Sequence, residues 1–228
     1  MVPPIVDCVK PWEHLATAPT PDGYHLELWQ HDRDYAIRAD GYDLMVSRAH
    51  QSEDQMMARA CPRPRSGAQV LVGGLGMGYT LRAVLDALPA DGAAVVSELI
   101  PEVIEWNRGV LGSLADRPLD DARTEVDARD VVHVIRDANA RFDAILLDVD
   151  NGPTAPTQQA NKRLYTERGL QEVADALRPG GAVAIWSVDE QRGFERRLRR
   201  AGFEPRTHRI RAHGKRGGSH YVLVGTKH

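Results

Sequence analysis

The chain has 228 residues, 42% of them hydrophobic, and a net charge of −3, so it can bury the core of one large domain, alone or with a small appendage. So small a charge argues against nucleic acid or an anionic membrane surface as a partner, because either one needs a broad basic face. The two cysteines form no motif, no apolar run could span a bilayer, and the first residues lack the regions of a signal peptide. We therefore expect a cytoplasmic protein. The histidines and cysteines show no metal-ligand spacing, so we expect no metal.

A small antiparallel β unit is predicted near the N-terminus. Residues 1–22 are rich in proline and are expected to form an irregular arm. Short alternating runs then predict strands at residues 25–30, 35–38 and 44–46. Asp40-Gly41, between the last two runs, is a hairpin-turn signal.

A helix and a break follow the β unit. Ser52-Glu53-Asp54-Gln55 is a capping-box pattern, which predicts a helix that opens there and runs to about Ala60. Proline, arginine and glycine in residues 61–67 then interrupt the chain. We therefore divide the chain into residues 1–61, with the arm, the β unit and the helix, and residues 62–228, a ligand-binding domain.

The most informative stretch is a glycine loop at residues 73–78. An apolar strand precedes it, a helix over residues 80–88 follows it, and a second apolar strand at 93–97 ends in Glu98. Glycines let the backbone approach a ligand, and a helix N-terminus offers free N–H donors. An acid at the position of Glu98 can accept hydrogen bonds from a ribose. Glycines also occur in ordinary tight turns, but the strand, the helix and the spaced acid together favour nucleotide binding.

Apolar strands and helical patterns alternate in the rest of the chain. Strands are predicted at residues 123–127, 142–148, 182–186, 204–210 and 219–226. Helices are predicted at residues 101–111, 130–135 and 190–200, and one more ends near Leu177 after a polar loop. This alternation predicts an α/β fold, with a mostly parallel central sheet that is covered by helices on both faces.

Acidic residues stand where the ligands of such folds bind. Asp148 ends a buried strand, at the edge of the sheet where open α/β sheets hold ligands. With Asp150 and Asn151 it could bind a cationic substrate or deprotonate an amine, although Asp-Asn-Gly-Pro is also good turn chemistry. Asp130 could contact a ligand, cap its helix, or do both. Tyr79 could flank the ligand or pack against the β unit.

These residues resemble the class I S-adenosylmethionine-dependent transferases and, within them, the spermidine synthase-like family. The resemblance runs from about Tyr24 to Thr226 and includes the β unit, the glycine loop with Thr80-Leu81-Arg82, the strand ending at Asp148, and Pro179-Gly180-Gly181. It implies a Rossmann-like fold, a homodimer, and S-adenosylmethionine or its decarboxylated form as the cofactor. It also implies the following roles: Gly74, Gly76 and Gly78 line the cofactor, Glu98 holds its ribose, Asp130 faces its adenine, and Asp148 lies beside the reacting centre.

Three departures from the family pattern bear on the reaction. Met77 stands where spermidine synthases have an aspartate in the glycine loop, next to the cofactor's aminopropyl arm. Asp148-Val149-Asp150-Asn151-Gly152-Pro153 replaces Asp-Ser-Ser-Asp-Pro, and Gln51-Ser52-Glu53 replaces Tyr-His-Glu. Because a neutral Met77 gives no preference for the decarboxylated form, we expect methyl transfer to a small nitrogen-containing acceptor. Aminopropyl transfer to a polyamine is the alternative, since the acidic residues suit a cationic amine. A non-catalytic cofactor-binding protein on the same fold is the third possibility.

Overall fold

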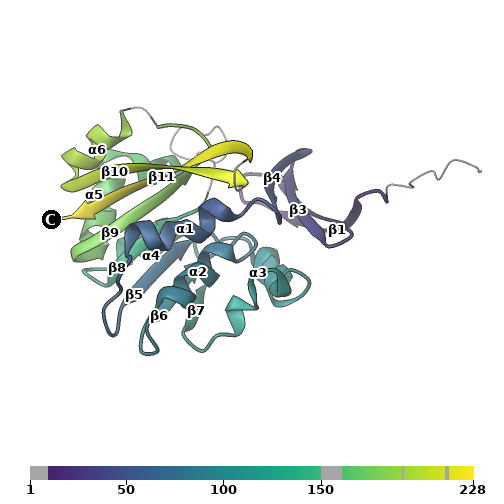
Figure 1. Cartoon of the computed structure of the whole chain (residues 1–228), viewed down its shortest axis with the longest axis horizontal. Coiled ribbons are helices and arrows are strands. Elements are labelled where there is room, and N and C mark those ends of the chain that lie inside the picture. The colour runs from purple at the N-terminus through teal and green to yellow at the C-terminus, as the bar shows by residue number, and fades with distance from the viewer. Residues whose placement is uncertain (1–9, 150–160, 192, 214–215) are drawn as a thin grey trace, which may run out of the picture. The chain divides into compact units, whose positions relative to one another are not determined.

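The computed structural model of the chain describes residues 10–149, 161–191, 193–213 and 216–228. The chain forms two compact units, of which the first ends at Arg48 and the second begins at Ala49 (Figure 1). The helix that precedes the expected boundary at residues 61/62 belongs to the second unit, because it packs against a helix and several strands there.

The first unit is a four-stranded antiparallel sheet in the order β1-β2-β3-β4. Its strands are β1 (Glu13–Pro19), β2 (His25–His31), β3 (Asp34–Ala39) and β4 (Tyr42–Val46). The predicted turn joins β3 to β4, with both Asp40 and Gly41 at positive φ. The prediction of an irregular arm is wrong for β1. Ala18 is the one buried residue of this edge strand, so β1 lacks the alternation of large apolar residues that identifies a strand, and an edge tolerates Pro19.

The second unit is built on a seven-stranded sheet in the order β10-β11-β9-β8-β5-β6-β7. Strands β9, β8, β5, β6 and β7 are parallel, whereas β11 runs antiparallel to both β9 and β10. The bounds are β5 (Gln69–Gly73), β6 (Ala93–Ser97), β7 (Thr124–Asp127), β8 (Phe142–Leu147), β9 (Leu177–Ser187), β10 (Phe203–His213) and β11 (Arg216–Lys227). The predicted α/β fold with a mostly parallel sheet is confirmed.

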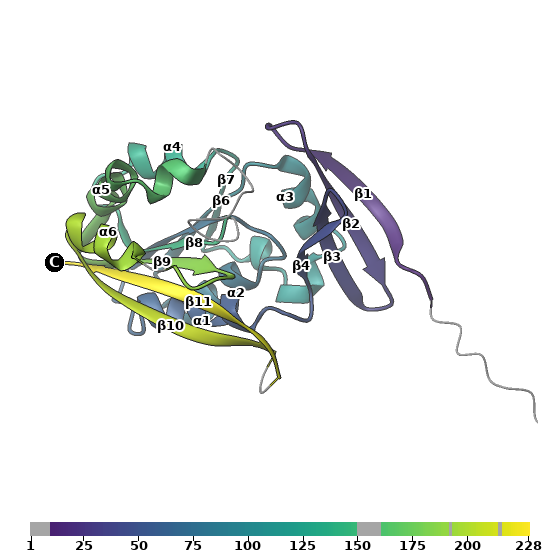
Figure 2. The same cartoon turned by 90° about the horizontal axis from the view of Figure 1, so that it is seen from above.

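Helices cover both faces of this sheet. They are α1 (Gln51–Ala60), α2 (Tyr79–Ala87), α3 (Pro101–Arg108), α4 (Val131–Asp137), α5 (Glu167–Ala176) and α6 (Phe194–Arg200), with short 3₁₀ turns at Gly112–Ala115, Pro118–Asp120 and Asn161–Tyr165. Helices α1 and α2 lie on one face, and α4, α5 and α6 lie on the other (Figure 2). Within the described residues, no helix is both long enough and apolar enough to cross a bilayer.

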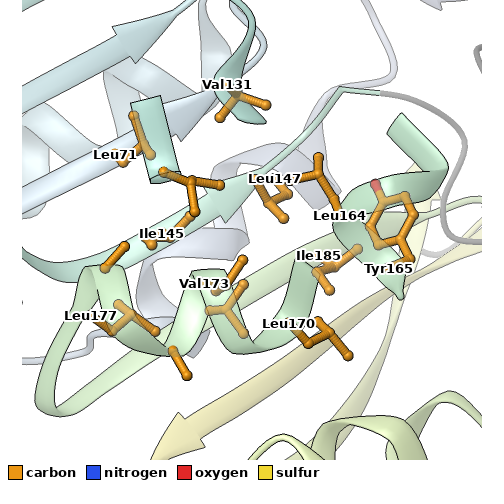
Figure 3. Close-up of a cluster of buried hydrophobic side chains, with 14 of the residues drawn as sticks. Leu71, Val131, Ile145, Leu147, Leu164, Tyr165, Leu170, Val173, Leu177 and Ile185 are labelled. Atoms are coloured by element: carbon orange, nitrogen blue, oxygen red, sulfur yellow. The ribbon is translucent and has the colours of Figure 1, made fainter. Parts of the chain in front are cut away.

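The core lies between the central strands and the helices α4 and α5 (Figure 3). Leu71 on β5, Ile145 on β8 and Ile185 on β9 are fully buried, as is Val173 on α5. Burial of such side chains is the main driving force for folding, at about 25 cal/mol per Å² of apolar surface. This packing fixes the strand ends from which the polar residues of the site project.

Three local predictions need correction. His50 precedes α1 without a side-chain cap, and Ser52 lies inside the helix, fully buried, because its hydroxyl bonds to side chains of other elements rather than to the helix end. The strand predicted at residues 182–186 begins earlier, because Pro179-Gly180-Gly181 also lies within β9, where the pairing with β8 shifts register. The helix expected over residues 190–200 begins only at Phe194.

Candidate active site

The candidate site lies where the order of the parallel strands reverses. From β5 the chain builds the sheet outward through β6 and β7, and then returns to place β8 on the other side of β5. Ligands of open α/β sheets bind at such a point, beyond the carboxyl ends of the strands. Backbone bonds tie the segments that leave those ends: Asp148 N donates to Gly73 O at 2.9 Å, and Gly74 N donates to Ser97 O at 2.9 Å.

The glycine loop has a backbone that other residues rarely adopt. Gly74, Gly76 and Gly78 have φ values of 90°, 52° and 86°, in the left-handed region that favours glycine. A Cβ on Gly74 would also overlap the carbonyl oxygen of Asp148. Gly78 directly precedes α2 and has no side chain that could cap the helix. The loop therefore presents bare backbone and a helix N-terminus, which suits a nucleotide-like ligand.

The side chain of Glu98 fixes the backbone of this loop by hydrogen bonds. Its side chain is buried, with Oε2 accepting from Leu75 N at 3.0 Å and Oε1 accepting from Ile100 N at 2.9 Å. Burial raises the pKa of Glu98, although these backbone N–H groups act in the opposite direction. A carboxylate oxygen has a second lone pair, so ribose binding by Glu98 stays a prediction beside this structural role.

Three other predicted ligand contacts have clear structural positions. Asp130 caps α4, its Oδ1 accepting from Val132 N at 2.8 Å, so contact with an adenine would be a second role. Met77 is 1% exposed, and its contact with a cofactor stays a prediction. Tyr79 is buried and stacks on His50, with ring centroids 4.0 Å apart; its place beside a substrate also stays a prediction.

Asp148 joins the loop side of the site to its acidic side. It follows β8 and is half-buried, and its Oδ2 accepts from the hydroxyl of Thr80 at 2.8 Å. Thr80 lies in the first turn of α2, so this bond fixes the carboxylate against the helix that follows the glycine loop. Asp150 and Asn151, which were expected to act with Asp148, lie outside the described residues.

Glu53 is a second carboxyl group in the site, and the sequence analysis did not include it among the site residues. It lies on α1 and is 5% exposed. Burial and then the negative charge of Asp148 raise the pKa of Glu53 to about 8, against the opposing hydrogen bond from Ser52. The signal was present in Gln51-Ser52-Glu53, but we interpreted Ser52 and Glu53 as a capping box. Two carboxyl groups whose charges interact can bind a cation, and in their ionised form they can accept a proton from an amine.

Ser52 connects Glu53 to the far strands of the sheet. Its hydroxyl donates to Glu53, accepts from Trp186 Nε1 on β9 at 2.9 Å, and lies 2.8 Å from His220 Nδ1 on β11. Four elements thus contribute side chains to the acidic side: α1, the end of β8, β9 and β11. Among the described residues, no three His, Cys, Asp or Glu side chains are grouped as a metal site would require.

Sequence comparison relates the chain to polyamine enzymes. A sequence model of the spermine/spermidine synthase domain matches residues 53–193. Polyamine aminopropyltransferase 2 of Pseudomonas aeruginosa is 28% identical over 186 residues, which are 78% of this chain and 47% of the relative. The protein of the same name from Hyperthermus butylicus is 31% identical over 139 residues, 56% of this chain and 39% of the relative. The chain thus spans about half the length of these relatives or less.

Structural comparison shows the fold. Spermidine synthase from Thermotoga maritima aligns over 94% of this chain and 73% of its own, with a TM-score of 0.72 and 22% identity. A 1,6-didemethyltoxoflavin-N1-methyltransferase from Burkholderia thailandensis aligns over 79% of each chain, with a TM-score of 0.55 and 21% identity. Both likenesses concern the fold, which carries more than one chemistry.

Proposed function

Because the chain belongs to the spermine/spermidine synthase domain family, we propose that it is an aminopropyltransferase, which moves an aminopropyl group from decarboxylated S-adenosylmethionine to an aliphatic amine. The sequence analysis preferred methyl transfer and gave this reaction as the alternative. The curated relatives are named polyamine aminopropyltransferases, which supports the alternative over the reaction that we expected first.

The observation that carries the proposal is the pair of carboxyl groups, Glu53 and Asp148. Asp148 accepts a hydrogen bond from Thr80 on α2, and Glu53 lies on α1, which packs against α2. The charge of Asp148 acts on Glu53. Because Glu53 and Asp148 repel each other when both are ionised, a cation beside them would relieve that repulsion and is attracted to the site. An aliphatic diamine, positively charged at neutral pH, has the charge that such a pair favours.

Different residues of the chain would bind the cofactor and activate the amine. The loop formed by Gly74, Gly76 and Gly78 would hold the nucleoside part of the cofactor, with Glu98 keeping the loop in place. When bound, decarboxylated S-adenosylmethionine would supply an aminopropyl carbon that its sulfonium makes electrophilic, with a neutral thioether as the leaving group. Asp148 and Glu53 would orient the amine and take its proton, so that the nitrogen lone pair can attack.

Methyl transfer remains a second candidate because of Met77. An acid in the glycine loop would repel the carboxylate of intact S-adenosylmethionine, and Met77 cannot do so. Met77 is buried. Because its thioether is neutral, it supplies no charge that would select either form of the cofactor. The acidic pair on the other side of the site is therefore the feature that favours aminopropyl transfer.

The deciding experiment is incubation of the protein with each form of the cofactor and an aliphatic diamine, with products identified by mass spectrometry. We expect a product enlarged by an aminopropyl group, formed only with decarboxylated S-adenosylmethionine. A methylated product formed only with the intact cofactor would replace the proposal with methyl transfer. Calorimetric binding of either form without any product would favour the non-catalytic alternative.

A further inference from the structure

A buried chain of hydrogen bonds leads from Glu53 to the last strand. Ser52 lies next to Glu53 on α1 and is 0% exposed, and its hydroxyl reaches both Glu53 and His220 Nδ1. Ser52 and His220 are 168 positions apart in the sequence. The ring of Trp186 meets the ring of His220 nearly edge-on, with centroids 4.8 Å apart, so the imidazole packs against the indole. The ring of His220 is half-buried, and it can therefore exchange protons with solvent.

The Ser52 hydroxyl has a limited number of donor and acceptor sites, which restricts how these hydrogen bonds can be arranged. A serine hydroxyl donates one hydrogen bond and accepts two, and an indole N–H can only donate. Trp186 Nε1 therefore occupies one lone pair of Ser52. The hydroxyl proton and one lone pair remain for Glu53 and His220.

Two fully bonded arrangements satisfy this count. When Glu53 is ionised, Ser52 donates to it and His220 donates to Ser52 through a proton on Nδ1. When Glu53 carries a proton, it donates to Ser52, and Ser52 donates to an Nδ1 that carries none. In going from the second arrangement to the first, one proton moves along each bond and His220 loses its Nε2 proton, so the two arrangements differ by one proton in total.

We propose that Ser52 and His220 form a proton path from the amine site to solvent. Glu53, having taken a proton from the attacking amine, passes it to the Ser52 oxygen while the Ser52 proton passes to His220 Nδ1. His220 then holds protons on both ring nitrogens and releases one from Nε2 to water or buffer, which leaves Glu53 ionised. The inference rests on the proposed function for the source of the proton. Ser52 and His220 act through Glu53 and are positioning residues.

The charges around Glu53 make such a path necessary. Asp148 beyond β8 and Asp54 on α1 both favour the protonated form of Glu53, as burial does. On α2, which packs against α1, Arg82 pairs with Asp86. A carboxyl group in these surroundings keeps a captured proton, so each turnover needs a route by which the proton leaves.

The path can be tested without turnover, by nitrogen NMR of the histidine rings as pH is varied. We expect neutral His220 to change tautomer, from Nε2–H to Nδ1–H, as Glu53 ionises near pH 8. The change should disappear in Glu53→Gln, whose amide does not titrate. A single tautomer at all pH values in the wild type would overturn the path, whatever reaction the protein catalyses.

A kinetic test separates proton transfer from mere support of the site. His220→Asn places an amide N–H where it can still donate to Ser52, but an amide cannot relay a proton. We expect aminopropyl transfer in weak buffer to slow by about a hundredfold in this variant, within the range of acid–base contributions. Free imidazole should restore the rate in His220→Ala, by an amount that follows the pKa of the substituted imidazole used. His208→Asn, on the neighbouring strand β10, is the matched control and should keep the wild-type rate.

The outcomes are distinct. A wild-type rate and pH profile in His220→Asn would assign His220 a supporting role only and overturn the path. Rescue that is independent of the imidazole pKa would do the same, because filling a space does not depend on basicity. If the wild type transfers no aminopropyl group, the proposed function fails, and the tautomer measurement alone decides the path.

Discussion

The two sides of the candidate site are built in opposite ways. The glycine-loop side, residues 69–98, is a continuous stretch in which the glycines leave the backbone bare and Glu98 holds the loop. The carboxylate side consists of Glu53, Asp148 and the partners of Ser52, which come from segments up to 168 positions apart. The first side owes its shape to conformations that only glycine adopts easily. The second owes its chemistry to charges that tertiary packing brings together.

The two sides should therefore tolerate different kinds of substitution. A side chain added at Gly74 or Gly78 would meet neighbouring atoms at a backbone conformation that favours glycine. Side-chain recognition fails when charge or protonation changes, even if the shape is preserved. Substitutions of similar size on the two sides should therefore act through different causes, a changed backbone on the loop side and a changed charge on the carboxylate side.

The largest effect is expected from Gly74→Ala. The new Cβ would overlap the carbonyl oxygen of Asp148 at a residue with φ of +90°, which should cost more than about 3 kcal/mol of unfolding free energy. Gly180→Ala is the matched control, since Gly180 has φ of +76° with nothing within 4 Å of the added carbon. It should lose only about 1–2 kcal/mol. Urea unfolding measures both, and equal losses would show that the loop can move away from Asp148.

The next effect concerns Glu53 and pH. The pKa of Glu53 is about 8 in the folded protein against an ordinary value of 4.5, so between these values the folded state binds a proton that the unfolded chain releases. The free energy of unfolding should therefore fall as pH rises through this window. Glu53→Gln should remove that decrease and be more stable than the wild type at pH 9, by on the order of a few kcal/mol.

Denaturant unfolding of both proteins from pH 5 to pH 9 measures this difference. The buried Glu98 is present in both, so its contribution cancels when the two curves are subtracted. Parallel curves would mean that neither burial nor the charge of Asp148 raises the pKa of Glu53, and would remove the main support for the acidic pair.

Asp148→Asn should act on the reaction rather than on binding of the cofactor. The amide preserves the bond from Thr80 but cannot take a proton at neutral pH, so turnover should fall by about a hundredfold or more. Steady-state kinetics and calorimetric titration of the cofactor check the two parts. Asp86→Asn, at an exposed ion pair with Arg82 on α2, is the control. A wild-type rate in Asp148→Asn would place the base elsewhere.

The smallest effect is expected from Glu98→Gln, which sharpens the contrast on the loop side. The amide can accept only one of the two backbone N–H groups, from Leu75 and Ile100, that the carboxylate now accepts. We expect a loss of about 1–3 kcal/mol in unfolding free energy, with weaker cofactor binding as a consequence. The sequence analysis assigned Glu98 to the ribose of the cofactor and gave it no part in holding the loop. Unchanged stability with weakened binding would restore that simpler interpretation.

The sequence predicted the loop side well because its parts are neighbours along the chain. The order of strand, glycines, helix and acid at Glu98 is a local pattern, and the central strands are apolar enough to be recognised one by one. The carboxylate side could not be predicted in the same way. Ser52 and Glu53 fit a capping box locally, and nothing within ten residues of them indicates a bond to His220. Strand β1 escaped prediction for a related reason, since an edge strand buries too little to show alternation.

The position of β11 has a consequence for the order of assembly. The last strand of the chain does not join the edge of the sheet but pairs between β9 and β10. During synthesis β10 therefore has no partner in this sheet until residues 216–227 have emerged. The glycine loop can fold well before then, because domains form from the N-terminal side and local contacts form fast. The bond between Ser52 and His220 can therefore close only after β11 has been inserted between β9 and β10.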